Sequence, residues 1–352
     1  FISQGSAMEY DLTKAIKKIT IKDKPSIGFI TGHGEPELNK MAQAVQELGV
    51  LNTVETIDLS KEQTIPERYQ ALVLVDPTDS IPVDQFTKLN NYLAKGGKIF
   101  VAVNAVNGDL STASGSEVKH DVFPWLQSLG VTVDHTFLID AACAKVTVQQ
   151  QRSSYFSFAT QINFPYLPLV NKFPDHPATK GLEAVIFQFA SPIKYAGSGS
   201  GTFTPLVTTS DKAGTQQAPL YFDVNKQWTN ADFPMSKLVI GGVVEGAQNN
   251  PESKLVVFSD GDFFVSEQGK VNGDNVNLVV NTLEWMVDKS GLAELRTKGI
   301  VYRPIKDLEE GKRTFTKYLN FLLPLILVGL VGLWRTQRSR NLRIRRMEEK
   351  YS

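Results

Sequence analysis

The sequence predicts an α/β protein whose parallel sheet is covered by helices on both faces, followed by one C-terminal helix that spans a membrane. Three observations support this fold class. Apolar strands alternate with amphipathic helices through residues 1–145, helical periodicity fades between 146 and 250, and an uncharged apolar run occupies 318–334. Continuous apolar strands that alternate with helices are typical of a parallel sheet buried on both faces.

The first section, residues 1–145, begins the predicted α/β domain. Its helix boundaries follow local signals, because proline is favoured in a first helical turn and glycine just beyond a last one. The expected elements are, in order, a strand at 26–31, a helix from Pro36 to Gly49, strands at 53–59 and 71–75, a helix from Pro82 to Gly96, a strand at 98–103, a short helix at 123–129 and a strand at 131–139.

Residues 146–250 read as a β-rich lobe or insertion, in which short β-type runs such as 184–190 and 238–244 are separated by Pro, Gly, Asn and Ser. Residues 251–300 then close the α/β domain with a strand at 254–258 and a helix that Asp274 is expected to cap. The rest of the chain is predicted to be a juxtamembrane connector at 301–317, a transmembrane helix at 318–334 and a basic cytoplasmic tail at 335–352.

The apolar run from Tyr318 to Trp334 carries no charge and has an aromatic residue at each end. At about 1.5 Å per residue it reaches roughly 25 Å, near the lower limit for crossing the hydrocarbon layer. Six arginines follow it within twelve residues, at positions 335, 338, 340, 343, 345 and 346. Because Lys and Arg mark the cytoplasmic flank of a span, the tail is predicted to be cytoplasmic and the large folded part extracytoplasmic. The alternative is a buried core helix followed by a basic surface.

The charge is unevenly distributed, although the formal net charge is zero. Residues 335–352 contain seven basic and two acidic side chains, whereas the rest of the chain has 30 basic and 35 acidic. A mildly acidic body excludes a nucleic-acid partner on electrostatic grounds, and the basic tail suits the lipid bilayer or a cytoplasmic partner.

The one cysteine, Cys143, excludes an internal disulfide. Because the chain begins at Phe1 without a leader sequence, we expect an upstream segment, with another span, to direct it outward.

Two short segments are candidate ligand or partner loops. Gly32, His33, Gly34 and Glu35 follow the first strand, where glycines could cradle an anion at a helix start, and the alternative is a tight turn satisfied by local hydrogen bonds. Asp260 and Asp262 follow the strand at 254–258. Since ligands gather at strand ends of open α/β sheets, these residues could meet His33 and Glu35 and hold a metal, although such aspartates more often serve turns. No metal or other cofactor is expected.

The motifs for catalysis are absent from the sequence. A cysteine hydrolase needs its nucleophile on a sharp strand-to-helix elbow, but no glycine accompanies Cys143, and Asn104 occupies the elbow after the strand at 98–103. The serine pattern occurs only at 197–201, without an apolar strand before it. No Gly-x-x-x-x-Gly-Lys-[Ser/Thr] occurs, so any ATP-driven role needs a separate ATPase.

Several segments together resemble a known family. They are the motifs at 10–13, 27–35, 92–98, 176–182, 204–209, 256–263 and 281–285, with the Pro-containing span and its arginines. In this order they resemble the auxiliary membrane components of ABC transporters, in particular the GldG-type subunit of the gliding-motility-associated transporter. The resemblance implies an extracytoplasmic fold similar to class I glutamine amidotransferases, without their catalytic machinery. It also implies a bacterial inner-membrane location beside permease and ATPase subunits. The family often has Asp-Pro where this chain has Asn104-Ala105, which argues against a preserved ligand site there.

The sequence therefore predicts a non-catalytic, membrane-anchored subunit of an ABC transporter complex. Its outer domain would meet an unknown envelope partner or cargo, and its last helix would dock on the permease. Pro324, Gly329 and Gly332 fit packing against other spans, or else a tolerated kink. Two alternatives remain open: a membrane-anchored, amidotransferase-like hydrolase that uses His33 and Glu35, and a glycan- or peptide-binding module.

Overall fold

The computed structural model describes residues 24–153, 156–197, 201–266, 271–288 and 310–351. The chain divides into two compact units, Phe1–Arg303 and Pro304–Ser352. The first is a mixed α/β unit and the second consists, in its described part, of one helix. Of the predicted juxtamembrane connector at 301–317, residues 301–309 lie outside the described residues and 310–317 are helical.

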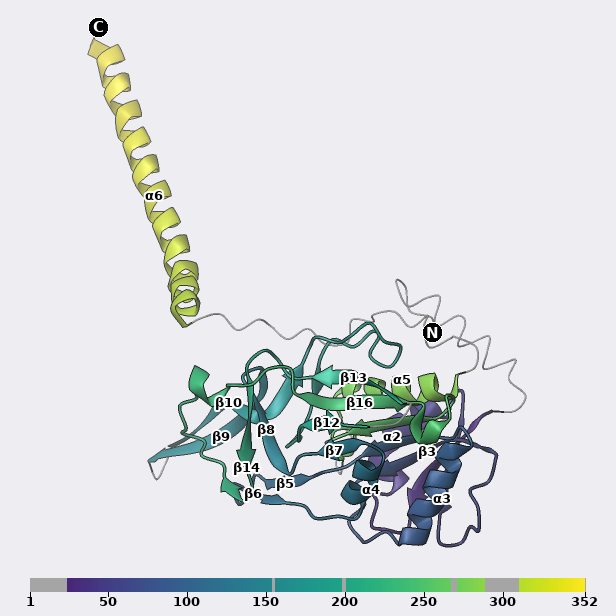
Figure 1. Ribbon diagram of the computed structural model, residues 1–352. Coiled ribbons are helices and arrows are strands. Elements are labelled where there is room, and N and C mark those ends of the chain that lie inside the picture. The colour runs from purple at the N-terminus through teal and green to yellow at the C-terminus, as the bar shows by residue number, and fades with distance from the viewer. Residues whose placement is uncertain (1–23, 154–155, 198–200, 267–270, 289–309, 352) are drawn as a thin grey trace. The chain divides into compact units, whose positions relative to one another are not determined.

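The first unit is organised around a nine-stranded sheet within the described residues (Figure 1). Its first five strands are parallel and the others antiparallel. The strand order is β2 (Thr53–Asp58), β1 (Ser26–Thr31), β3 (Tyr69–Val75), β4 (Lys98–Ala102), β17 (Lys254–Phe258), β16 (Val239–Glu245), β12 (Ile193–Tyr195) and β7 (Val131–Val133), with β13 (Thr202–Thr208) also paired to β16. The expected parallel sheet is confirmed in this half, and the whole sheet is mixed.

Helices cover both faces of this sheet (Figure 1). Phe100 and Phe258 point to the layer that holds η1 (Leu38–Met41), α2 (Ala42–Leu48) and α5 (Gly273–Val287). Their strand neighbours Ile99 and Val257 point to the layer of α3 (Val83–Ala94) and α4 (Val122–Ser128). Since successive residues of a strand face opposite sides, both sets are buried only because both faces are covered.

Residues 146–250 are rich in antiparallel strands and also contribute β12, β13 and β16 to the central sheet. Five aromatic rings, Phe137, Phe164, Tyr166, Phe189 and Phe222, pack into a separate buried cluster beside it. The smaller sheets around this cluster are β11 (Val185–Ile186) with β10 (Phe156–Val170) and β9 (Cys143–Ser153); β14 (Ala213–Gln217) with β8 (Thr136–Asp140); and β15 (Leu220–Tyr221) with β6 (Ser114–Glu117) and β5 (Val106–Asp109). Two short 3₁₀ turns, η2 (Asn230–Asp232) and η3 (Ala247–Asn249), complete the described elements.

Three local predictions differ from the structure. The strand expected at 131–139 is two strands, because the chain leaves β7 at Asp134 and enters β8, which pairs with β14 in a different sheet. The helix α5 is capped by Asn272, whose side chain accepts the Asp274 N–H at 3.1 Å. The Asp274 carboxylate instead accepts the N–H groups of Glu183 and Ala184 at 2.8 and 2.9 Å, so it fastens a distant loop to the helix. The run at 184–190 is a strand only over Val185–Ile186.

The second unit contains α6, Glu310–Tyr351. Within it, Thr314–Arg345 is long and apolar enough, by length and composition, to cross a membrane. The large apolar side chains from Phe315 to Trp334 are exposed in the isolated chain, in contrast to those of a core helix. An apolar surface of this extent is stable only when lipid or other protein covers it, so α6 is a candidate membrane anchor.

Candidate functional site

The carboxyl ends of four parallel strands meet at one edge of the central sheet. β1, β3, β4 and β17 end at Thr31, Val75, Ala102 and Phe258, and polar loops follow each of them. A cleft of about 620 Å³ opens at this edge. Its lining residues are Gly34, Glu35, Pro36, Glu37, Asn39, Lys40, Asp76, Thr78, Gln188, Asp262 and Val265. This is the position at which open α/β sheets carry their ligands.

The loop after β1 is a tight turn that satisfies its own polar groups. The backbone N–H of His33 donates to Glu35 Oε2 at 2.7 Å, and His33 Nδ1 lies 3.0 Å from Glu35 Oε1. Both side chains are almost completely buried, with 6% and 2% exposed. The His33 carbonyl accepts the N–H groups of Thr78 and Asp79. His33 and Glu35 are therefore held by each other and by the loop after β3.

Gly34 is required by this close contact between the two loops. Its φ is +77°, which side-chain-bearing residues rarely adopt, and a Cβ there would lie 2.0 Å from Thr78 Oγ1. The glycine pattern that suggested an anion cradle thus has a structural reason. Within the described part of the chain, the ionisable lining of the cleft is four acids, Glu35, Glu37, Asp76 and Asp262, with Lys40. This balance disfavours an anion.

The loop after β17 places two aspartates in different environments. Asp260 is fully buried and accepts the N–H groups of Gln188 at 2.5 Å and Asp262 at 2.8 Å. Burial, reinforced by the nearby Asp262 charge, raises the pKa of Asp260 well above its usual range. Asp262 opens on the cleft and accepts an N–H from Asn104 Nδ2 at 2.9 Å. Partial desolvation also raises the pKa of Asp262.

Asp76 is a third member of this group, and it directly follows β3. Burial, and then repulsion from Asp262, raise the pKa of Asp76 to about 7. Its φ of 37° lies in the left-handed region, where Asp and Asn are the most tolerated side chains. An aspartate within a few residues of the end of a buried strand, as at 260 and 262, is the sequence signal that could have identified it. Burial is the first cause of the raised pKa in Asp76, Asp260 and Asp262, and the charge of Asp262 adds to it for the other two.

The predicted site residues are therefore only partly brought together. Gly34, Glu35 and Asp262 line the same cleft, whereas Gly32, His33 and Asp260 are not among its lining residues. Among the described residues, no group of three or more His, Cys, Asp or Glu side chains is arranged to hold a metal ion.

Cys143 and Ser259 lie outside the cleft lining. Burial raises the pKa of the Cys143 thiol to about 11, which leaves little reactive thiolate at neutral pH. Ser259 is fully buried, and its hydroxyl donates to the Ser191 carbonyl. Asn104, after β4, has its amide engaged on both sides, because its Oδ1 also accepts the Gly261 N–H at 2.8 Å.

These features define an α/β protein with an acidic cleft at a sheet edge and a candidate membrane anchor in the same chain. The chain belongs to the family of ABC-transporter auxiliary components, since the family model described as "ABC-type uncharacterized transport system" matches residues 24–285. Membership associates it with the components of an ABC-type transport system. No curated protein matches the sequence.

Solved structures give a similar picture of the fold. The chain is similar to the mmIFT52 N-terminal domain with a TM-score of 0.50 and 14% identity, over 75% of this chain and 98% of that one. At this identity the likeness concerns the fold alone. A thua-like protein from Parabacteroides merdae ATCC 43184 matches with a TM-score of 0.39 and 12% identity, over 81% of this chain and 94% of that one. A score of this size adds no argument about the fold.

Proposed function

We propose that the chain is a non-catalytic, membrane-anchored auxiliary subunit of an ABC transporter, with its α/β unit outside the cytoplasm and its basic tail inside. The observation that carries this proposal is the family match over residues 24–285, in a chain that also contains α6. The six arginines that follow the apolar run favour the cytoplasm for the tail.

In this proposal the energy for transport comes from another subunit. The sequence contains no phosphate-binding loop of the Gly-x-x-x-x-Gly-Lys-[Ser/Thr] type. A separate ATPase hydrolyses ATP, and α6 packs against the spans of a permease. The exposed apolar surface of α6 between Phe315 and Trp334 supports such packing, because permease helices and lipid would both cover it.

The contacts at the carboxyl edge of the sheet support a non-catalytic role. A hydrolase needs a nucleophile within hydrogen-bond reach of a base. Here the His33 ring contacts Glu35, and the position after β4 holds Asn104, an amide. We propose that the fold is a class I amidotransferase-like arrangement whose strand-end site serves binding.

The cleft is the proposed surface for an envelope partner or cargo. Glu37 lies exposed at its rim, where it accepts an N–H from Asn39 Nδ2 at 2.8 Å. A positively charged group of a partner would complement the acidic lining. Charge reversal by Glu37→Lys should therefore weaken capture of the envelope partner and leave the permease and ATPase bound, with Glu62→Lys as a surface control outside the cleft. Equal loss in both variants would contradict this role.

Affinity purification of the full-length chain from its own membrane tests the central proposal. We expect a permease and an ATPase to co-purify in fixed ratio. Recovery of the chain alone, in a mild detergent that preserves other transporter complexes, would overturn the proposal. A GldG-type role further predicts that deletion of the gene abolishes gliding on surfaces and that the full chain restores it, whereas unchanged gliding would remove that assignment.

The proposed orientation can be tested with thiol labelling. Cys143, the one cysteine, is a weakly reactive background, so single cysteines can be introduced at exposed positions. A membrane-impermeant maleimide should label Gln63→Cys in intact spheroplasts and Ser339→Cys only after permeabilisation. Labelling of both positions from the same side would contradict the orientation.

The hydrolase alternative makes a different prediction. A purified chain that hydrolyses ester or amide substrates, and loses this activity on His33→Ala but not on His120→Ala, would replace the non-catalytic proposal. We expect no turnover above background for any of the three proteins. Thermal unfolding of each variant distinguishes a lost activity from a lost fold.

A further inference from the structure

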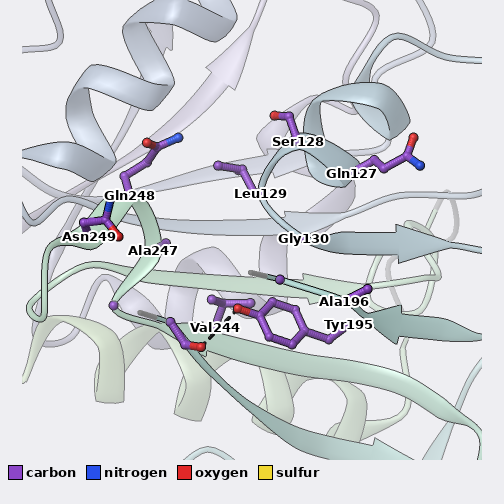
Figure 2. Close-up of a pocket in the computed structure, with 13 residues that line it drawn as sticks. Gln127, Ser128, Leu129, Gly130, Tyr195, Ala196, Val244, Ala247, Gln248 and Asn249 are labelled. Atoms are coloured by element: carbon purple, nitrogen blue, oxygen red, sulfur yellow. Dashed lines mark hydrogen bonds between the residues drawn. The ribbon is translucent and has the colours of Figure 1, made fainter. Parts of the chain in front are cut away.

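A second pocket lies at the opposite edge of the sheet from the aspartates. β16 is antiparallel to β17, so its last residue, Glu245, pairs with Lys254 at the start of β17, whereas Gly241 pairs with Phe258 at the end that leads to the aspartates. The pocket, of about 270 Å³, is bounded by the α4–β7 turn, the end of β12 and the β16–η3 turn (Figure 2). Its lining residues are Gln127, Ser128, Leu129, Gly130, Tyr195, Ala196, Gly197, Gly201, Val244, Gly246, Ala247, Gln248 and Asn249.

The chemistry of this lining is polar but uncharged. No Asp, Glu, Lys, Arg or His is present among those lining residues that the structure describes. Three carboxamides, Gln127, Gln248 and Asn249, belong to this lining, and the side chains of Gln127 and Gln248 each carry both a donor and an acceptor. Figure 2 shows Gln248 and Asn249 on one side of the pocket and Gln127 on the other, with the Tyr195 ring beside Val244 below them.

Tyr195 is held firmly at this place. Its hydroxyl donates to the Gly201 carbonyl at 3.1 Å, which leaves the phenolic oxygen free to accept a further hydrogen bond. Its ring stacks on Phe203, with centroids 5.2 Å apart and an interplanar angle of 13°. The pocket thus contains one rigid aromatic residue with a polar edge, a group suited to contact both the apolar face and the hydroxyls of a small ligand.

Two walls of the pocket are backbone segments, around Gly130 and Gly197, that lie very close together. A Cβ at Gly130 would lie 2.6 Å from the Gly197 Cα, and a Cβ at Gly197 would lie 2.3 Å from the Tyr195 hydroxyl oxygen. The Ala196 N–H donates to the Gly130 carbonyl at 2.9 Å and joins these two walls. Any larger residue at positions 130 or 197 would push the walls apart or fill the space around Tyr195.

The third wall, at the β16–η3 turn, has an unusual backbone conformation. Gln248 and Asn249 are consecutive non-glycine residues with positive φ, 52° and 58°. Such backbone conformations are unfavourable for residues with a side chain and persist where surrounding contacts fix them. Here Ser253 Oγ donates to the Ala247 carbonyl at 2.5 Å, and the Gly246 N–H donates to the Ser253 carbonyl at 3.0 Å. This turn keeps two carboxamides at the pocket.

We propose that this pocket binds an uncharged, hydroxyl-rich ligand, namely a neutral sugar unit. A hydroxyl group both donates and accepts, as the carboxamides of the lining do. A charged ligand would lose part of its hydration on entry and meet no opposite charge in the described lining, which is unfavourable. The volume is close to the lower bound of about 300 Å³ for ligand clefts, and this size fits one sugar residue better than an extended peptide. The sugar unit that binds is either a free sugar or the terminal residue of a neutral glycan.

The binding test uses the full-length chain in a polyoxyethylene detergent, because glucoside and maltoside headgroups carry the chemistry under test. Ligand-detected NMR and calorimetry measure neutral methyl glycosides of glucose, galactose, mannose and N-acetylglucosamine, together with neutral trisaccharides. Glucuronate and glucosamine are the charged counterparts, and a capped uncharged tripeptide represents the peptide class. We expect binding of at least one neutral glycoside. Tighter binding of the trisaccharide than of its terminal unit would identify a glycan end as the source.

Two variants locate the binding. Gln248→Gly removes a carboxamide while keeping a residue that accepts positive φ, and Gln127→Ala removes another from an exposed helix position. Each should weaken binding about two- to tenfold, the effect of one lost hydrogen bond. Lys237→Gly is the matched control, because Lys237 is exposed, has φ of 51° and lies outside the pocket. Three outcomes would overturn the proposal: no neutral glycoside binds, a charged sugar or the tripeptide binds more tightly, or the two variants bind as the control does.

Discussion

The amide nitrogen of Asn104 donates to the carboxylate of Asp262 at 2.9 Å, although 158 positions separate these residues in the chain. Asn104 follows β4 and Asp262 follows β17, two adjacent parallel strands. The contact supplies a neutral donor to a group that already contains three carboxyls, Asp76, Asp260 and Asp262. A hydrogen bond to the charged form of Asp262 favours that form, so it opposes the effect of burial on this carboxyl.

Replacing Asn104 by Asp should destabilise the α/β unit. The change removes the donor to Asp262 and adds a fourth carboxyl, so we expect the free energy of unfolding to fall by about 1–3 kcal/mol at pH 7.5. The loss should shrink at pH 5, where a protonated carboxyl can again donate. Thermal or chemical unfolding in detergent measures both values. Asn39→Asp is the control, since Asn39 also donates to a carboxylate, Glu37, but on the exposed rim; equal effects of the two changes would contradict the argument.

Asp76 should make stability depend on pH. Its pKa is raised to about 7 in the folded state, against 3.8 for the ordinary group, so the folded protein binds more protons between these values. This contribution to stability is therefore present at low pH and is lost as the pH rises from about 4 to about 7. Asp76→Asn removes it, and the unfolding free energy of Asp76→Asn minus that of the wild type should increase across this range.

The matched control for this pH profile is Asp109→Asn. Hydrogen bonds from Ser111 and Thr112 lower the pKa of Asp109 to about 2, so its stabilising contribution is lost only as the pH falls from about 4 towards 2. The difference between Asp109→Asn and wild type should stay flat from pH 5 to pH 7. A flat profile for Asp76→Asn over the same range would show that Asp76 keeps an ordinary pKa.

Gly261 should tolerate no side chain while Asp76 is present. A Cβ at position 261 would lie 2.6 Å from the Asp76 Cβ, far inside van der Waals contact. We expect Gly261→Ala to lower the unfolding free energy by about 1–3 kcal/mol through overpacking. Adding Asp76→Gly removes the opposing atoms and suits the positive φ at 76, so the double variant should recover part of this loss. A double-mutant cycle without coupling would show that the strain arises elsewhere.

The glycines of α6 should matter for assembly and not for folding of the chain itself. At Gly329 and Gly332, the described residues outside the helix itself place no heavy atom within 4 Å of the position a Cβ would take. Gly329→Leu should leave the unfolding of the α/β unit unchanged and reduce co-purification of the permease, because a large side chain blocks close helix approach. Val331→Leu is the control. Undiminished co-purification with Gly329→Leu would mean that this face of the helix meets lipid.

Cys143 should react slowly with thiol reagents. With a pKa of about 11, its thiolate fraction at pH 8 is on the order of a hundredfold below that of an ordinary thiol. Maleimide labelling rates for Cys143 and for an introduced Gln63→Cys should differ by at least that factor, since Cys143 is also half-buried. Comparable rates would make Cys143 unsuitable as a silent background and would require Cys143→Ser for the labelling experiment.

Local patterns in the sequence were sufficient for much of the fold. The structure confirms the strands predicted from the apolar runs at 71–75 and 98–103 and the helices that follow Pro36 and Pro82. These elements were predictable because helix and strand formation depends on side chains a few positions apart. The split of 131–139 was not predictable in this way. Val131 and Phe137 keep one alternating pattern, and only their partners, β12 and β14, place them in different sheets.

The candidate sites show the same division. The sequence by itself determined that polar loops follow buried strands and that an uncharged apolar helix precedes the arginines, since both are properties of contiguous residues. Only the tertiary structure decided that Asp76 joins Asp262 beside Asn104, and that Gln127, Tyr195 and Gln248 line one pocket. The physical reason is that strand order and register are selected by packing across the whole sheet, which brings together residues far apart in the chain.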